Sequence, residues 1–399
     1  TALSLILIAA AVPFELTTLE DQTASGNLVG LSADTVTLKT DDGEKEYPVE
    51  GLLSLSPASA REPATQGKIL VELADGSVVP ASDYSVKTGR ATITLPSGNS
   101  FTTSTRDLKA VRFLEQDERE RQLWDEIVAS NPKGDAVVVR KGGDDKPVTL
   151  DFLEGALRDV SKSTVQFEFD GDVIPVNRSK VQVAGLIYYR REGSSTPQAL
   201  CRVDTTGGER WMAKEVTLNG DQLQFTSASG IERTVSLSRI ENLDFSLGKI
   251  AYLSDLQPVK DDWRPFLGSS NISDSTRKLF KFRRDQTFTG DTIRLGQREF
   301  RKGLAVHSRS EISYRLPGEF SRFEAIIGID PNQKNRGHVR LEIRGDNRVL
   351  FDEAIAGDAA AVPLELDVSG VGRLTVLVDF GEGWDIGDQL LLGGARVIR

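Results

Sequence analysis

Polar and apolar residues alternate along most of this 399-residue chain. An alternation of period two places every second side chain on one face of a strand, and it is typical of sheets with one buried face. Helical periodicity is almost absent. The clearest exception is 116–130, where acidic residues precede Trp124 and Ile127 and where Asn131-Pro132 ends the pattern. The pattern therefore predicts an all-β protein with one short helix near 116–130.

Four stretches in the first two-thirds share one arrangement: a strand, a polar turn with a glycine, a second strand and a closing apolar strand. The turn glycines are Gly43, Gly98, Gly171 and Gly230. Glycine suits these turns because tight hairpins need a positive φ. Another hairpin-like segment precedes each stretch, so each repeat holds about five strands, the size of a small SH3-like or Sm-like barrel or of one layer in a β-stack.

The repeats are short, and short units bury little area alone, so we expect neighbouring repeats to pack together. The predicted divisions are a signal remnant at 1–12, repeats at 13–57, 67–115, 135–192 and 198–257, a helix or linker at 116–132, linkers at 57–66 and 193–197, and a separate domain at 260–399.

The last third carries a different set of motifs. These are Lys302-Gly-Leu-Ala-Val-His-Ser308, Gly328-Ile-Asp330, Gly345-Asp346-Asn347, Leu366-Asp-Val-Ser-Gly370 and Gly387-Asp388. Together they resemble the NPCBM family of carbohydrate-binding modules, found at the ends of secreted bacterial glycosidases, over roughly 263–399. The resemblance implies an antiparallel, jelly-roll-like β-sandwich that binds sugar. The strand patterns at 323–330, 339–344 and 374–380 agree with a sandwich.

Sugars are recognised by an exposed aromatic face and a few fixed polar groups. Trp384 is the best candidate, flanked by Glu382, Asp385 and Asp388. The alternative is that Trp384 plugs one end of the sandwich. The other candidates are His307, which we expect to be buried in a strand, and Asn335, Arg336 and His338, which lie in a predicted loop.

Two further points bear on the ligand. The resembled family ends in an Asp-His pair followed by Asp-Trp, whereas this chain has Gln389 and Leu392 in place of the His and Trp. If those positions serve the core, the fold survives; if they serve the ligand, sugar binding is lost. Asp330 and Asp388 offer oxygen ligands that suit a structural Ca²⁺, with strand capping as the alternative. No other cofactor is predicted.

Charge and composition exclude several classes of function. The net charge is −10, and residues 260–399 hold 22 of the 49 basic and 21 of the 59 acidic residues, so the acidic excess lies in the first part. An acidic surface repels phosphate backbones, so we expect no nucleic-acid partner. The single cysteine, Cys201, excludes an internal disulfide, and the two histidines leave few candidates for histidine-dependent catalysis.

The first residues, 1–12, form a short apolar run that ends in small residues. This pattern predicts the end of a secretory signal with cleavage near Ala11; a buried first strand or helix is the alternative. The run is shorter than the roughly 20 residues that a transmembrane helix needs. We therefore predict a secreted, periplasmic or cell-surface protein without a transmembrane span.

These observations predict a non-enzymatic glycan-binding protein whose β repeats act as a spacer or as an assembly platform for protein partners. One alternative is an extracellular structural or protein-interaction protein whose sandwich does not bind sugar. A second is a glycoside hydrolase accessory or enzyme, which would need two carboxylates roughly 5–10 Å apart in a cleft.

Overall fold

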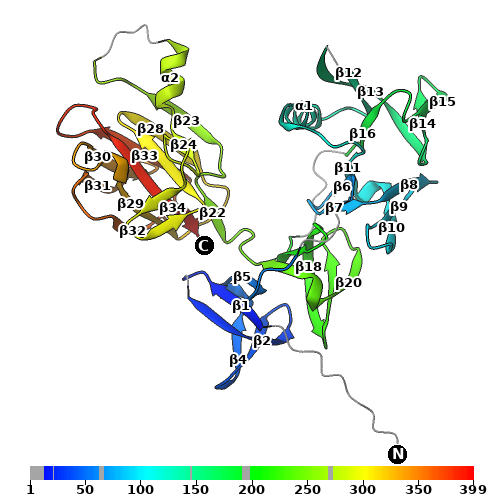
Figure 1. The fold of residues 1–399 in the computed structure, drawn as a ribbon, viewed down its shortest axis with the longest axis horizontal. Coiled ribbons are helices and arrows are strands. Elements are labelled where there is room, and N and C mark those ends of the chain that lie inside the picture. Colours follow the sequence, from blue (N-terminus) through cyan, green and yellow to red (C-terminus); the bar gives the residue numbers. More distant parts are fainter. Residues whose placement is uncertain (1–12, 21, 63–66, 144–145, 191–197, 268–272) are drawn as a thin grey trace, which may run out of the picture. The chain divides into compact units, whose positions relative to one another are not determined.

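The computed structural model describes the chain except residues 1–12, 21, 63–66, 144–145, 191–197 and 268–272 (Figure 1). The chain divides into two compact units, Thr1–Leu247 and Gly248–Arg399. The described residues are mainly β-strands, with two α-helices, α1 (Glu118–Ala129) and α2 (Asp274–Phe280). The all-β prediction is confirmed. The predicted signal at 1–12 and the linker at 193–197 lie outside the described residues, as do positions 63–66 of the first linker.

The first unit contains four successive groups of strands, which we call repeats 1 to 4. Repeat 1 has β1 (Pro13–Thr18), β2 (Thr23–Leu31), β3 (Thr35–Thr40), β4 (Gly43–Pro48) and β5 (Leu52–Pro57). Repeat 2 has β6 (Ile69–Leu73), β7 (Val78–Ala81), β8 (Asp83–Lys87), β9 (Arg90–Thr94), β10 (Ser100–Ser104) and β11 (Leu108–Arg112). Repeat 3 has β12 (Asp135–Gly143), β13 (Lys146–Val160), β14 (Thr164–Phe169), β15 (Asp172–Asn177) and β16 (Val183–Ile187). Repeat 4 has β17 (Cys201–Thr205), β18 (Arg210–Asn219), β19 (Gln222–Ser227), β20 (Glu232–Ser236) and β21 (Ile240–Asp244).

Every repeat uses the same antiparallel strand order, in which the last strand pairs with the first and the others follow as a meander. In repeat 1 the order is β5-β1-β2-β3-β4. In repeat 2 the second strand is split into β7 and β8. Among the described strands, the fourth strand of each repeat pairs with the third, and no ladder joins it to the last. The separate closed barrels of the SH3-like or Sm-like interpretation are therefore not observed, and the four repeats form one connected 21-stranded network.

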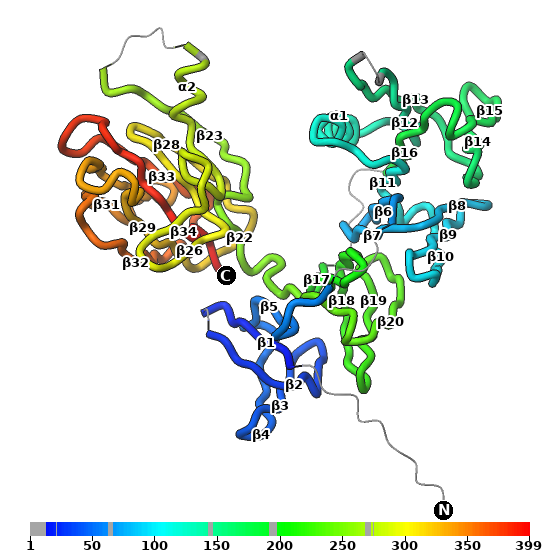
Figure 2. The backbone as a smooth tube through the Cα atoms, viewed as in Figure 1, coloured from blue at the N-terminus to red at the C-terminus, as the bar shows by residue number. Residues whose placement is uncertain are grey.

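The repeats are joined through their last strands. The antiparallel pair β5–β21 places Leu55 opposite Leu243 and joins repeat 1 to repeat 4. The pair β11–β16 places Val111 opposite Leu186 and joins repeat 2 to repeat 3. The tube in Figure 2 shows β16, β11 and β6 next to one another. Repeats 1 and 4, the outer pair in the sequence, are thus joined to each other, and so are repeats 2 and 3, the inner pair.

A second contact links these two pairs of repeats. Phe101 in β10 packs edge-on against Trp211 in β18, with the ring centroids 5.4 Å apart. The Asp75 carboxylate accepts a hydrogen bond of 2.8 Å from the backbone N–H of Ser229. Trp211 is fully buried, so this contact holds repeat 2 against repeat 4 through the core rather than through surface charges.

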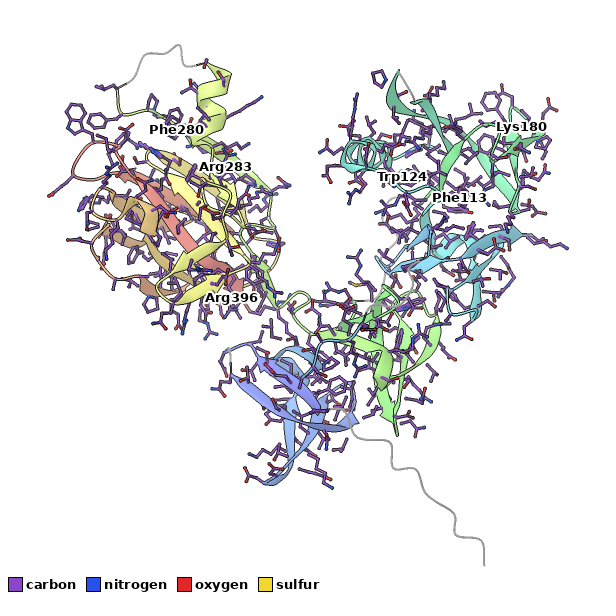
Figure 3. All side chains as sticks on the ribbon, viewed as in Figure 1. Phe113, Trp124, Lys180, Phe280, Arg283 and Arg396 are labelled. Carbon is purple, nitrogen blue, oxygen red and sulfur yellow. The ribbon has the colours of Figure 1, made fainter. Side chains whose placement is uncertain are left out.

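Helix α1 lies over the junction between repeats 2 and 3. It begins at a capping box, in which Asp117 accepts from the backbone of Glu120 and Glu120 accepts from the backbone of Asp117. Trp124 is buried by the helix against β11, β12 and β16, and Figure 3 labels it there. Gly185 in β16 provides the space, because a Cβ at this position would collide with the Trp124 ring and with the carbonyl of Val111. The helix predicted over 116–130 is confirmed.

The second unit is a sandwich of two antiparallel sheets. One sheet has the order β24 (Arg283–Arg284), β27 (Gly303–His307), β34 (Gln389–Ile398), β29 (Arg322–Ile329) and β32 (Val362–Asp367), with β22 (Ile250–Tyr252) also paired to β34. The other has the order β23 (Pro258–Trp263), β28 (Ser310–Arg315), β33 (Arg373–Phe380), β30 (His338–Gly345) and β31 (Arg348–Ala356). A small hairpin of β25 (Ile293–Leu295) and β26 (Arg298–Phe300) flanks the first sheet.

Alternating strand residues from both sheets fill one apolar core. Phe323 and Leu392 enter it from the first sheet and Leu341 and Val376 from the second, and all four are fully buried. Because β22 pairs with β34, the sandwich unit includes residues before the predicted start at Lys260. No described helix in either unit is long and apolar enough to span a bilayer.

Candidate functional site

Several loops of the sandwich are tied together at one end around Asp388. The Ser308 hydroxyl donates to Oδ2 of Asp388 at 2.7 Å, and the backbone N–H of His338 donates to Oδ1 at 3.0 Å. The loops that follow β27, β29 and β33 are thereby joined by one carboxylate. Asp388 is fully buried, and this burial raises its pKa above the ordinary carboxyl value, while the Ser308 and His338 hydrogen bonds act in the opposite direction.

His338 orders the next loop. Its Nδ1 accepts a hydrogen bond of 2.8 Å from the backbone N–H of Glu382. Gly381 lies directly against His338, and a Cβ at Gly381 would collide with the imidazole and with the His338 carbonyl. Asn335 and Arg336 are exposed on the preceding loop, and Asn335 has a φ of 68°. Of these residues, His338 holds the 381–388 loop in place, through the hydrogen bond to Glu382 and the contact with Gly381.

Trp384 is held outward by the conformation of this loop. Its φ is 73°, and it forms an isolated bridge with Gly381. The side chain is 59% exposed. Phe266 stacks against it with ring centroids 5.7 Å apart and an interplanar angle of 19°, and Phe380 supports Phe266 edge-on at 5.0 Å. We call Phe266 and Trp384 the aromatic ledge.

The ledge has the features that a sugar ring requires. A supported indole ring presents a rigid apolar surface, and the carboxylates of Glu382 and Asp385 flank it in sequence and can accept hydroxyl hydrogen bonds. Leu267 and Ile386 beside it are also exposed. Trp384 therefore does not plug the end of the sandwich.

His307 lies in the interior, away from solvent. It is 5% exposed, and its Nδ1 donates to the carbonyl of Ser308 at 2.5 Å. The ring of Phe280 meets it edge-on at 4.8 Å, and Phe280 stacks on Trp263 at 4.7 Å. Figure 3 labels Phe280, which comes from α2. His307 thus belongs to an aromatic cluster beneath the loops and offers no exposed ligand surface.

A polar hollow of about 380 Å³ lies beside the 330–332 segment, and sequence reasoning identified only one of its residues, Asp330. Its lining consists of Thr287, Asp291, Thr292, Arg294, Glu299, Asp330, Pro331 and Asn332. Hydroxyl, carboxylate, amide and guanidinium groups meet there without an aromatic ring. The missed residues come from a turn, a hairpin and the short 3₁₀ segment after Asp330, and no recognisable motif in the sequence singles them out.

The predicted Ca²⁺ ligands, Asp330 and Asp388, both accept hydrogen bonds from the protein itself. Both carboxylate oxygens of Asp388 accept protein hydrogen bonds, and Oδ1 of Asp330 accepts from the backbone N–H of Asn332 at 2.9 Å. Within the described ranges, no group of three or more acidic, cysteine or histidine side chains could hold a metal ion. Asp330 acts instead as the cap of a short 3₁₀ turn.

The two departures from the family ending fall on strand β34. Leu392 is fully buried and pairs with Leu304 of the neighbouring strand, so this position serves the core. Gln389 is half-buried, and its carbonyl accepts from the backbone N–H of Asp330 at 2.8 Å. The substitution at Leu392 therefore leaves the exposed aromatic ledge intact.

Residues 252–398 match the family model described as the NPCBM/NEW2 domain. A curated protein of Renibacterium salmoninarum named "Putative endo-alpha-N-acetylgalactosaminidase" is 34% identical over 82 residues, which is 20% of this chain and 5% of that protein. The match thus spans about a twentieth of that relative's length.

Two solved structures are also similar. The CBM51 module from Clostridium perfringens GH95 in complex with methyl-galactose is 24% identical, with a TM-score of 0.31, and covers 37% of this chain and 99% of its own. The tandem CBM51 modules of the family 98 glycoside hydrolase from Streptococcus pneumoniae are 13% identical, with a TM-score of 0.32, and the match covers 96% of this chain and 88% of theirs.

Proposed function

Because residues 252–398 form an NPCBM/NEW2 domain, we propose that the sandwich binds carbohydrate at the aromatic ledge. The observation that carries this proposal is Trp384, which is 59% exposed yet supported on one side by Phe266. A sugar ring packs its C–H face on such an indole, and nearby carboxylates accept its hydroxyls. The hydrogen bonds around Asp388 hold the loop in place before the ligand arrives, which reduces the entropy lost on binding.

The chain as a whole serves as a glycan-binding protein outside the cytoplasm, and its four repeats act as a spacer or assembly platform. Their strands are joined into one connected network, which supports a scaffold role. Single sugar sites of this kind are weak, with a Kd on the order of 1 mM, or about −4 kcal/mol. Retention on a surface then depends on several copies acting together.

A glycan array tests the proposal on the full chain, with galactose- and N-acetylhexosamine-terminated glycans included. We expect specific binding, and we expect Trp384→Ala to reduce it at least about tenfold because the stacking surface is removed. Ile386→Ala is the matched control, since Ile386 is equally exposed on the same loop but offers no ring. Absence of binding by the folded chain, or equal loss in both variants, would contradict the proposal.

One observation favours a second candidate, protein binding at the same end. Leu267 and Ile386 extend the exposed apolar surface beyond the ledge, and exposed clusters of this kind also mark protein interfaces. In that case the array stays silent, and variants of Ile386 weaken an interaction with a protein as strongly as variants of Trp384.

A further inference from the structure

The third repeat contains an apolar groove of about 540 Å³ that the sugar site does not involve. We call it the third-repeat groove. Its lining consists of Val137, Val139, Lys141, Asp151, Phe152, Leu153, Phe167, Ile174, Pro175, Val176, Asn177, Lys180 and Val181. Nine of these thirteen side chains are apolar, and the three charged ones, Lys141, Asp151 and Lys180, are exposed to solvent. A hollow of this size and lining is typical of sites for small apolar ligands.

The groove lies between the two hairpins of the repeat. Val137 in β12 stands opposite Leu153 in β13, and Phe167 in β14 stands opposite Ile174 in β15. Phe167 is fully buried and forms part of the floor, whereas Leu153, Ile174 and Val181 are each 44% exposed. Large aliphatic side chains that remain exposed around one hollow indicate an occupant that covers them.

Strand β15, at the edge of this repeat, is poorly suited to pairing with a further strand. The turn at Asp170-Gly171 closes the β14–β15 hairpin, so Phe169 and Asp172 form the hydrogen-bonded pair next to the turn. Pairs alternate along the ladder, so the backbone of Pro175 faces away from β14 toward the free edge. Proline has no N–H there, which removes the central outward donor of β15. This geometry favours an occupant of the groove over an added strand.

The rim carries one positive charge that no described acidic group neutralises. Lys141 forms an ion pair with Asp151 at 2.7 Å, so these two charges cancel. Lys180 stands exposed at the groove and makes no ion pair among the described residues; Figure 3 labels it on the outer part of the repeat. The groove therefore combines an apolar interior with a net positive rim, although the first unit as a whole is acidic.

We propose that the third-repeat groove binds a small anionic amphiphile of the fatty-acid class, with its aliphatic chain along Leu153, Phe167 and Ile174 and its head group at Lys180. The aliphatic chain covers the exposed side chains, and the carboxylate takes the place of the missing partner of Lys180. This site is independent of the sugar site, because all of its residues belong to the first unit.

The experiment titrates the full chain with decanoate and with decyltrimethylammonium, two probes with the same chain and opposite head charges, by isothermal titration calorimetry below their micellar concentrations. We expect decanoate to bind at least about fivefold more tightly, and Lys180→Gln to remove most of this preference. Leu153→Trp fills the groove from a half-exposed position and is expected to weaken decanoate about tenfold or more.

Val173→Trp is the matched control, because Val173 is similarly exposed and neighbours the groove residue Ile174 on β15, but on the opposite face of that strand. Circular dichroism verifies that each variant folds. Three results would overturn the proposal: no heat from decanoate with the wild-type chain, equal affinity for both probes, or equal loss in the Leu153 and Val173 variants. Self-association that Leu153→Trp abolishes, without decanoate binding, would make the groove an interface between copies of this chain and would also overturn it.

Discussion

Repeats 1 and 3 have the same strand order and a two-residue connection between their third and fourth strands, but the fourth strands carry different side chains at one aligned position. The register aligns Lys45 of β4 with Ile174 of β15, because Lys45 stands opposite Leu38 and Ile174 stands opposite Phe167 at the same distance from the turn. Lys45 carries its charge to solvent near Asp42, whereas Ile174 leaves an apolar rim. The same position of the architecture is therefore charged and solvated in repeat 1 and apolar at the groove in repeat 3.

The pairing of the repeats provides a second contrast. The β11–β16 junction is covered by α1, whereas the described helices leave the β5–β21 junction uncovered. The inner junction thus has strand pairing and the buried Trp124 beneath a helix, whereas the outer junction has strand pairing without a covering helix.

The largest expected effect comes from Trp124→Ala, which removes the side chain that buries the inner junction. Loss of a buried tryptophan destabilises by roughly 3–5 kcal/mol, and we expect about 4 kcal/mol here. Urea unfolding of the full chain measures it, with the transition of the first unit assigned by hydrogen exchange in β11 and β16. Tyr189→Ala is the control, because Tyr189 is 51% exposed and its loss should change stability by less than about 0.5 kcal/mol. If Trp124→Ala and Tyr189→Ala changed the free energy of unfolding equally, Trp124 would not stabilise the β11–β16 junction, and the two junctions would not differ in this respect.

Gly185→Ala comes next. The added methyl group collides with the Trp124 ring and the Val111 carbonyl, so we expect a loss of about 2 kcal/mol. Gly51→Ala in repeat 1 is the matched control, since no atom lies within 4 Å of its added Cβ. The same unfolding measurement applies. A neutral Gly185→Ala would mean that α1 is not packed tightly against β16.

Exchanging the two aligned residues changes ligand binding rather than stability. Ile174→Lys should close the third-repeat groove and weaken decanoate about tenfold, and Lys45→Ile should expose an apolar surface on repeat 1 that binds a hydrophobic dye. Both changes are expected to alter stability by less than about 1 kcal/mol, because each side chain is about half exposed. Unchanged binding in both variants would show that this position does not distinguish the repeats.

The smallest effect concerns the ion pair at the groove. The hydrogen bond from Lys141 lowers the pKa of Asp151 below its ordinary value. A carboxyl group whose pKa is lower in the folded than in the unfolded state stabilises the fold at pH values above the unfolded-state pKa. This contribution disappears as the pH falls through the folded-state pKa. Lys141→Gln should raise the pKa of Asp151 toward its ordinary value, as measured by an NMR titration of the carboxyl group; the backbone N–H of Phe152 still lowers it in the variant. An unchanged titration would show that Lys141 does not hold Asp151 in solution.

Local patterns predicted the elements well. Alternation placed the strands, and Gly171, with a φ of 88°, occupies the kind of turn that its residue type indicates. The helix at 116–130 followed from acidic residues before an apolar face. Helix α2 was missed because it has only seven residues and buries little more than the ring of Phe280 against Trp263.

Long-range relations could not be predicted. Nothing local tells β5 to pair with β21 rather than with the neighbouring repeat, because alternation along a strand shows which face is buried but not which strand becomes its partner. At the candidate site, Trp384 was singled out by residue type, but its supporting partner Phe266 was not, because the two meet only when distant loops converge. The open groove of repeat 3 depends on how two hairpins diverge, which strand periodicity does not encode.

The nested order of strand pairing has a consequence for biogenesis. A chain that emerges amino end first can join β11 to β16 once Ile187 is available, so the inner pair of repeats can form early. Strand β5 is synthesised long before β21, so its edge has no partner until Asp244 emerges. The chain segment between β5 and β21 is also longer than that between β11 and β16, so closing it costs more entropy. Slow translation or export between those points would leave an apolar strand edge exposed to other chains, which makes repeat 1 the vulnerable segment of a nascent molecule.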